Sequence, residues 1–290
     1  MLYNDEWKDF CVISTSQGMK LEKWGSYTLL RPDPQVIWED KNKLENYPNI
    51  DAIYHREGGG GKWQYNKPLP TEWIVGWRNL KFKVKPMGFK HTGLFPEQAV
   101  NWDKMIDVIT NANRPIKVLN LFAYTGGATV ACASAGAEVT HVDSAKNMVE
   151  RAKENIALSG LSDKVVRYIV DDCKKFVQRE IKRGKKYDAI IMDPPSYGRG
   201  PNGEMWKIET DIFPLVELCA QLLSDQPLFF LINSYTTGLQ PTVMSNILKM
   251  VLKGNFNVEA YEVGLKVINQ EGVYLPCGCS AFAYYKQKNK

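Results

Sequence analysis

The chain has 290 residues, 44% of them hydrophobic and 24% charged, with a formal net charge of +5. This composition is typical of a globular protein and excludes a disordered chain. No run of about 18 apolar residues occurs, and the polar start of the chain does not resemble a secretory signal, so we expect a cytoplasmic protein without membrane spans. The charge permits a nucleic-acid partner without requiring one. The six cysteines do not have the spacing of zinc ligands, and no metal site is expected.

Residues 1–85 predict a small β-rich domain. They hold six of the eight tryptophans and several short runs of alternating polarity. Residues 80–85 alternate with a period of two, which predicts a strand with one basic face. The glycine run 58–61 lacks the Ser or Thr of a phosphate-binding loop, because Trp63 occupies that position, so we expect a flexible loop. We expect this domain either to bind RNA or to cover one edge of the main sheet.

Residues 86–290 predict a second domain in which strands and helices alternate. Such alternation is typical of an α/β fold, with a doubly wound, mostly parallel seven-stranded sheet and helices on both faces. The expected elements are strands at 117–123, 138–143, 165–170, 187–192, 227–233, 256–267 and 273–285, and helices ending near 111 and spanning 128–137, 144–159, 208–223 and 241–253.

The strand, glycine turn, helix and second strand over residues 117–143 predict a nucleoside-binding unit. Gly126 and Gly127 open the helix, so the backbone can turn tightly and a ligand can approach the helix amides. Asp143 ends the second strand and is placed to accept hydrogen bonds from both hydroxyls of a ribose. The glycine pattern of dinucleotide enzymes is absent, which argues against a nicotinamide-dependent oxidoreductase and favours adenosine without phosphates. The alternative is a glycine turn and a surface carboxylate of an ordinary parallel sheet.

A second motif, Asp193-Pro194-Pro195-Ser196-Tyr197, follows the strand at 187–192. Open α/β sheets bind their ligands at the carboxyl ends of such strands. Two prolines remove two backbone donors and leave carbonyl acceptors beside a carboxylate, an arrangement that suits an amino group. Tyr197 can stack against a planar base. The alternative is a proline turn that only ends the strand.

The glycine turn, the acid and the proline motif together resemble the class I (Rossmann-like) S-adenosylmethionine-dependent methyltransferases. From Gly93 to the C-terminus, the chain is similar to the bacterial 23S ribosomal RNA large-subunit methyltransferases of the RlmI-like group, and residues 1–80 lie outside this resemblance. The resemblance rests on residues 93–98, 120–127, 142–144, 154–155, 171–172 and 193–197.

This resemblance implies an enzyme that uses S-adenosyl-L-methionine and methylates RNA, specifically 23S ribosomal RNA. Asp143 would hold the ribose. Asp172 would accept from the adenine amino group, with Asp171 as the competing candidate. The implied cofactor-binding residues are Gln98 (from a preceding lid), Phe122, Ala123, Tyr124, Thr125, Gly126, Asp143, Ser144, Asp171, Asp172 and Asp193, and the candidate catalytic residues are Asp193, Pro194 and Tyr197.

The methylated atom is a separate question. Formation of 5-methylcytosine requires a cysteine thiolate, yet Ser196 and residues 233–235 occupy the positions where related cytosine enzymes carry it. Transfer to a base nitrogen needs no covalent catalyst and fits the sequence better. Cys277 and Cys279 remain candidate nucleophiles, although we favour structural thiols. The alternatives are a small-molecule or protein substrate, which the modest charge supports, and a catalytically silent RNA-binding protein.

Overall fold

The computed structural model describes residues 1–41, 43–58, 60–88, 90–199 and 205–286. The chain forms two compact units. The first comprises Met1–Val100 and Val263–Cys277, and the second comprises Asn101–Glu262 and Gly278–Lys290. The division into two domains after residue 85 stays a prediction. No helix among the described residues is long and apolar enough to cross a membrane.

The first unit is built from β-strands. Five strands form one sheet in the order β1-β2-β3-β4-β5, in which β3 and β4 are parallel and the other neighbours antiparallel. A separate hairpin pairs β6 with β7, whose residues Leu80, Phe82 and Val84 are buried while Lys81 is exposed, so the strand with one basic face is confirmed. The elements are β1 (Phe10–Ser16), β2 (Met19–Trp24), β3 (Tyr27–Pro32), η1 (Leu44–Asn46), β4 (Ala52–Glu57), β5 (Gly60–Tyr65), β6 (Trp73–Trp77), β7 (Leu80–Val84) and η2 (Pro96–Gln98).

The glycine run of this unit differs from the expected loop. Gly60 already belongs to β5 and lies opposite Glu57 of β4. A Cβ on Gly61 would lie 2.2 Å from the carbonyl oxygen of His55, so the pairing of the two strands requires glycine there. Gly60 and Gly61 therefore lie in a paired strand, and Gly59 lies outside the described residues.

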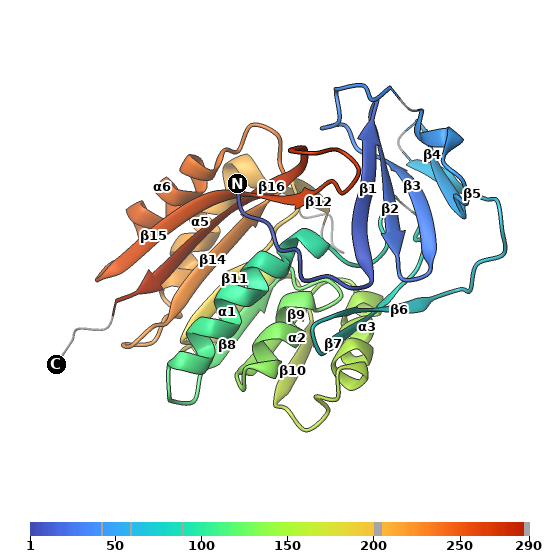
Figure 1. Cartoon of the computed structure of the whole chain (residues 1–290). Coiled ribbons are helices and arrows are strands. Elements are labelled where there is room, and N and C mark those ends of the chain that lie inside the picture. Colours follow the sequence, from blue (N-terminus) through green and yellow to red (C-terminus); the bar gives the residue numbers. More distant parts are fainter. Residues whose placement is uncertain (42, 59, 89, 200–204, 287–290) are drawn as a thin grey trace. The chain divides into compact units, whose positions relative to one another are not determined.

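The second unit contains the predicted doubly wound sheet (Figure 1). Its strand order is β10-β9-β8-β11-β14-β16-β15, and the five strands from β10 to β14 are parallel, while β16 runs antiparallel to β14. The elements are α1 (Ala99–Asn111), β8 (Lys117–Leu121), α2 (Gly127–Ser134), β9 (Glu138–Asp143), α3 (Lys146–Leu158), β10 (Val166–Val170), α4 (Cys173–Lys182), β11 (Ala189–Met192), β12 (Tyr197–Arg199), β13 (Met205–Lys207), α5 (Ile208–Ala220), β14 (Phe229–Ser234), α6 (Pro241–Val251), β15 (Phe256–Lys266) and β16 (Tyr274–Tyr285).

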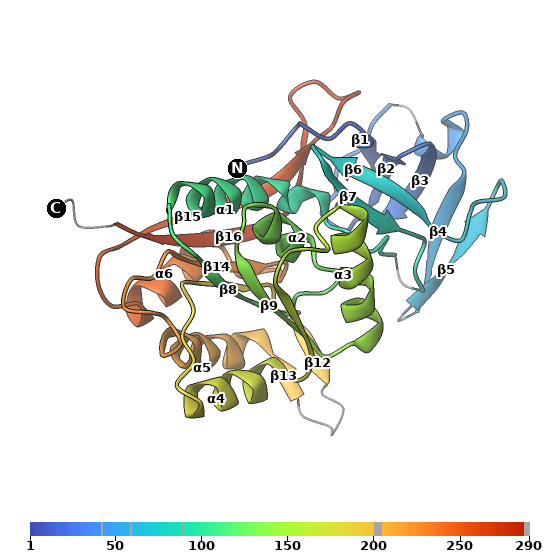
Figure 2. The same ribbon diagram turned by 90° about the horizontal axis from the view of Figure 1, so that it is seen from below.

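Helices cover both faces of this sheet. The helices α1, α2 and α3 lie on one face, and α4, α5 and α6 lie on the other (Figure 2). The layer between the sheet and α4–α6 is a continuous apolar core that includes Leu119, Phe176, Leu215 and Phe230, all at most 1% exposed. Burial of this apolar surface holds the strands in a fixed register.

The register aligns the carboxyl ends of the parallel strands. Leu121, at the end of β8, pairs with Val142 on one side and with Met192 on the other. Asp143 pairs with Val170, the last residue of β10. The strand order reverses between β8 and β11, which is where open α/β sheets bind ligands.

Candidate active site

The turn after β8 has an unusual backbone conformation. Phe122, Tyr124 and Gly126 have φ angles of 54°, 50° and 83°, and the first two are not glycines. Left-handed conformations are costly for side chains with a Cβ, and they cluster at functional sites where the surrounding structure holds them in place. The turn ends at Gly126, whose carbonyl oxygen accepts the Val130 N–H at 2.8 Å in the first turn of α2.

The two glycines of the turn serve packing as well as bending. A Cβ on Gly126 would lie 2.8 Å from the Cβ of Ala152 in α3, and one on Gly127 would lie 2.7 Å from the Trp102 ring in α1. The space beside both residues is therefore filled by protein. A side chain at either position would therefore clash with a helix, and the approach of a ligand to the amides of this turn stays a prediction.

Asp143 ties β9 to this turn. Its Oδ2 accepts the Tyr124 N–H at 2.8 Å, and its Oδ1 accepts the Ala145 N–H at 2.9 Å. Burial raises the pKa of the Asp143 carboxyl, and the two N–H donors partly offset that effect. Each oxygen keeps a second lone pair, so the carboxylate can still accept from two hydroxyl groups.

Asp171 and Asp172 follow β10 at the same edge and are half-buried. Asp172 caps α4, because its Oδ1 accepts the Lys175 N–H at 2.8 Å. Asp171 forms an ion pair with Arg179 and accepts the Asp172 N–H at 2.8 Å. Both carboxylates therefore have structural partners, and Asp171 has the stronger one in the Arg179 guanidinium.

The proline motif occupies the carboxyl end of β11, on the other side of β8 from Asp143. Asp193 is half-buried, Pro194 is buried, and the next three residues are exposed. The Ser196 hydroxyl lies 2.6 Å from the Thr236 hydroxyl, which joins this motif to the segment after β14. The Tyr197 hydroxyl donates to the Met205 sulfur at 3.1 Å, so its ring lies along a small hairpin that the sequence did not predict.

A buried polar cluster lies at the carboxyl end of β14 and was missed by the sequence analysis. The Asn101 side chain donates to Asn233 at 3.2 Å and to Ser280 at 2.9 Å, and it accepts the Tyr261 hydroxyl at 2.7 Å. These four residues come from α1, β14, β16 and β15. An asparagine at the end of an apolar strand was the only signal in the sequence.

Burial, partial for Cys11 and Cys277, raises the pKa of all six cysteines. For Cys279 the pKa rises to about 11, and its thiol donates to the Leu239 carbonyl at 3.1 Å. Cys277 donates to the Leu275 carbonyl at 3.5 Å. A raised pKa disfavours the thiolate, which is the form of cysteine that acts as a nucleophile.

Most of the predicted site residues thus lie along one edge of the sheet of the second unit. Residues 122–126, Asp143, Asp171–Asp172 and Asp193–Pro194 all follow the ends of neighbouring strands, and Ser144 is exposed beside Asp143. Gln98 is buried in the first unit, and its predicted role stays a prediction.

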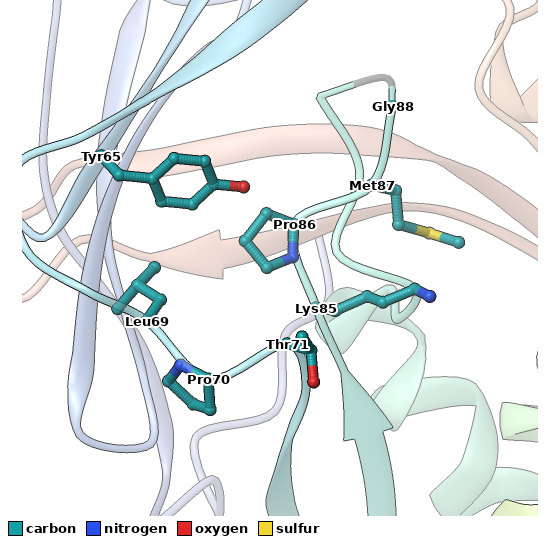
Figure 3. Close-up of a pocket in the computed structure, with 8 residues that line it drawn as sticks. All are labelled: Tyr65, Leu69, Pro70, Thr71, Lys85, Pro86, Met87 and Gly88. Atoms are coloured by element: carbon teal, nitrogen blue, oxygen red, sulfur yellow. The ribbon is translucent and has the colours of Figure 1, made fainter.

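A hollow of about 580 Å³ lies in the first unit (Figure 3). None of its lining residues is a predicted site residue, and Lys85 is the only charged one among them. The residues are Tyr65, Leu69, Pro70, Thr71, Lys85, Pro86, Met87 and Gly88. The candidate site is therefore assigned from the strand ends and not from this hollow.

Comparisons with known proteins agree with this assignment. Residues 50–219 match the family of S-adenosylmethionine-dependent methyltransferases. The ribosomal RNA large subunit methyltransferase K/L of Shewanella frigidimarina is 34% identical over 182 residues, which cover 61% of this chain and 25% of that protein. The counterpart in Shewanella baltica is 32% identical over 193 residues, or 66% of this chain and 26% of the relative. The chain thus spans about a quarter of the length of these curated relatives.

Solved structures give a fuller match. A SAM-dependent methyltransferase from Agrobacterium tumefaciens superposes with a TM-score of 0.93 at 34% identity, covering 98% of this chain and 93% of that one. SMU.776, whose structure contains SAH, has the same fold, with a TM-score of 0.76 at 18% identity over 96% of this chain and 76% of that one. With its aligned strand ends and its match over more than half of its length, the chain belongs to the family of S-adenosylmethionine-dependent methyltransferases.

Proposed function

We propose that the protein methylates a base nitrogen in structured ribosomal RNA of the large subunit, the 23S RNA. The observation that carries this proposal is the placement of Asp143 and the Asp193 motif on either side of β8, at one edge of one sheet. The Asp143 carboxylate suits a ribose, and the Asp193 motif suits the amino or imino group of a base. The names of the K/L relatives supply the RNA class.

The polar groups around the turn after β8 fit a nucleoside cofactor. The carboxylate of Asp143 keeps one lone pair on each oxygen for ribose hydroxyls and would repel a phosphate. Phe122–Gly126 would line the methionine and adenosine parts, and Asp172 or Asp171 would accept from the adenine amino group. Ser144 would lie beside the ribose, and Gln98 is kept as a further proposed cofactor-binding residue. The bound cofactor supplies an activated methyl group.

The chain's own residues then orient the acceptor. The Asp193 carboxylate and the Pro194 carbonyl would accept hydrogen bonds from an N–H of the base and turn the nitrogen lone pair towards the methyl group. The methyl group would pass from the sulfonium sulfur to the nitrogen, so that the S–C bond breaks as the N–C bond forms and S-adenosylhomocysteine is left. The nitrogen would lose its proton, and the Asp193 carboxylate would receive it. Burial raises the pKa of Cys277 and Cys279, which disfavours the thiolate that attack on cytosine requires, so a base nitrogen is the preferred acceptor over carbon 5 of cytosine.

The test is methylation of ribosomal RNA from cells that lack this protein. Purified protein and S-adenosylmethionine with a labelled methyl group should label the large-subunit RNA, and mass spectrometry of the digested RNA should place the label on one base nitrogen. An Asp193→Ala protein serves as the control. Label on carbon 5, on protein or on small molecules would contradict the proposal, and so would RNA binding without any transfer. An RNA substrate would also place the protein in the cytoplasm.

A further inference from the structure

The β12–β13 hairpin begins at the last residue of the proline motif and has two different faces. Tyr197 pairs with Lys207, Gly198 with Trp206, and Arg199 with Met205. Because side chains alternate along a strand, Gly198 and Trp206 share one face, and the other four residues share the opposite one. Burial follows this division, since Gly198 and Trp206 are half-buried and the other four are exposed.

The inner face fixes the hairpin to both halves of the candidate site. The Trp206 indole N–H donates to the Pro195 carbonyl at 2.6 Å. Its ring also packs against Phe122, the first left-handed residue after β8, with 5.3 Å between the ring centroids. Trp206 is therefore a positioning residue, because it holds the proline motif against the turn that begins the cofactor side.

The outer face combines an aromatic ring, a thioether and two cations. Tyr197 and Met205 are 50% and 51% exposed, which is high for apolar side chains of this size. Arg199 donates to the Tyr197 hydroxyl at 3.2 Å, so guanidinium, phenol and thioether lie together. Among the described residues of the hairpin, 197–199 and 205–207, none carries a carboxylate, and the nearby Asp211 is engaged by the backbone N–H of Lys207 at 2.8 Å.

We propose that this outer face binds the RNA chain beside the nucleotide that is methylated. An exposed aromatic ring next to arginine and lysine suits a base and the phosphates that flank it, since stacking and charge together hold single-stranded RNA. Tyr197 follows Asp193 by four residues, so the hairpin begins within roughly 14 Å of the acceptor site. A base delivered to Asp193 must bring its neighbours past this surface. The inference rests on the proposed RNA substrate.

The two cations give a direct test by charge removal. We compare Arg199→Gln/Lys207→Gln with Lys249→Gln/Lys253→Gln. The second variant loses the same charge from two exposed residues, one in the last turn of α6 and one just after that helix. Helices that follow parallel strands end at the opposite edge of the sheet, so the control pair lies away from the site. The probe is an unmodified transcript of large-subunit ribosomal RNA, and its dissociation constant is measured by filter binding over a range of salt concentrations.

We expect the hairpin variant to bind RNA at least fivefold more weakly than the wild type, with a salt slope smaller by about 1.4, as two phosphate contacts of a single strand would give. The control pair should change neither quantity by as much, and S-adenosylhomocysteine affinity measured by calorimetry should be unchanged in both.

Equal losses of RNA affinity in both variants, or an unchanged salt slope in the hairpin variant, would overturn the inference. If the wild type neither binds nor methylates the transcript, the proposed function fails first. If it methylates the transcript and the hairpin variant binds normally, only this inference fails.

Discussion

The Asp143 carboxylate accepts the backbone N–H of Tyr124 at 2.8 Å, and Tyr124 itself is held in a left-handed conformation with a φ angle of 50°. The carboxylate therefore shapes the turn after β8 in addition to any contact with a ligand. Loss of this bond would relax the turn, because a tyrosine in that conformation pays a steric cost that the bond helps to offset.

The first prediction concerns this carboxylate. Asp143→Ala should weaken binding of S-adenosylhomocysteine by at least tenfold, or about 1.4 kcal/mol, because the charged acceptor for the ribose and the anchor of the turn are both lost. Isothermal titration calorimetry measures the affinity. Asp163→Ala is the matched control, since Asp163 is an exposed acid paired with Lys164. Unchanged affinity in Asp143→Ala would remove Asp143 from the cofactor site.

The second prediction separates the two sides of the site. Asp193→Ala should reduce turnover by at least a hundredfold, as expected for loss of a positioned proton acceptor, while affinity for S-adenosylhomocysteine stays within about threefold of the wild type. Single-turnover methylation and calorimetry on the same preparation give the two numbers. A parallel loss of both would assign Asp193 to cofactor binding and not to the acceptor.

The third prediction uses the protonated thiols. Since burial raises the pKa of both Cys277 and Cys279, the double variant Cys277→Ser/Cys279→Ser should keep its rate of RNA methylation within about threefold. A thiolate nucleophile would instead make the rate rise with pH and collapse in the variant. A loss of several orders of magnitude, with the fold intact by circular dichroism, would restore the cytosine-5 mechanism.

Much of this site was predictable because its parts are local in the sequence. In residues 117–143 the strands are recognisable from their apolar runs, and the turn from its glycines. The Asp193 motif is recognisable from its two prolines. The left-handed Phe122 was not predictable, because its conformation is imposed by partners such as Cys173, whose sulfur accepts the Phe122 N–H at 3.3 Å. The β12–β13 hairpin was missed because three-residue strands are too short to show a period.

The first unit is built from two segments that are far apart in the chain, and the sequence did not predict that they belong together. Residues 263–277 join it through contacts between positions far apart in the chain. Gln270 accepts both the N–H and the hydroxyl of Thr15, 255 positions away, at 3.1 and 2.6 Å. Strands at 256–267 and 273–285 were expected, but nothing local indicates that residues 263–277 belong with the N-terminal sheet. Such long-range pairing depends on the tertiary structure alone.

The fourth prediction concerns a buried ion cluster in the first unit. Arg31 donates to both oxygens of Glu22, at 2.7 and 2.9 Å, and Lys20 lies 3.6 Å away. Burial by itself would raise the pKa of Glu22, but the two cations hold it below its ordinary value of 4.5. Glu22→Gln leaves Arg31 without its counter-charge and should lower the free energy of unfolding by about 3–5 kcal/mol at neutral pH.

The pH dependence of that variant follows from the lowered pKa. The stabilisation by Glu22 is complete above pH 4.5 and is lost as the pH falls through the folded-state value. The difference in unfolding free energy between wild type and Glu22→Gln should therefore be constant near neutral pH and shrink below pH 4.5. Urea denaturation followed by tryptophan fluorescence measures it, since the Trp24 N–H donates to Glu22 at 3.1 Å. A constant difference down to pH 3 would contradict the assignment.

The fifth prediction tests Trp206 as a positioning residue. Trp206→Phe keeps a ring against Phe122 but removes the N–H that donates to the Pro195 carbonyl, a bond worth about 1 kcal/mol. The proline motif is then less firmly held, so kcat should fall about fivefold or more while the affinity for S-adenosylhomocysteine stays close to that of the wild type. Trp206→Ala also loses the ring and should weaken cofactor binding as well, because Phe122 loses its support. If Trp206→Phe and Trp206→Ala have equal effects on kcat and on cofactor affinity, the hydrogen bond to the Pro195 carbonyl has no separate role, and the indole acts only by filling space.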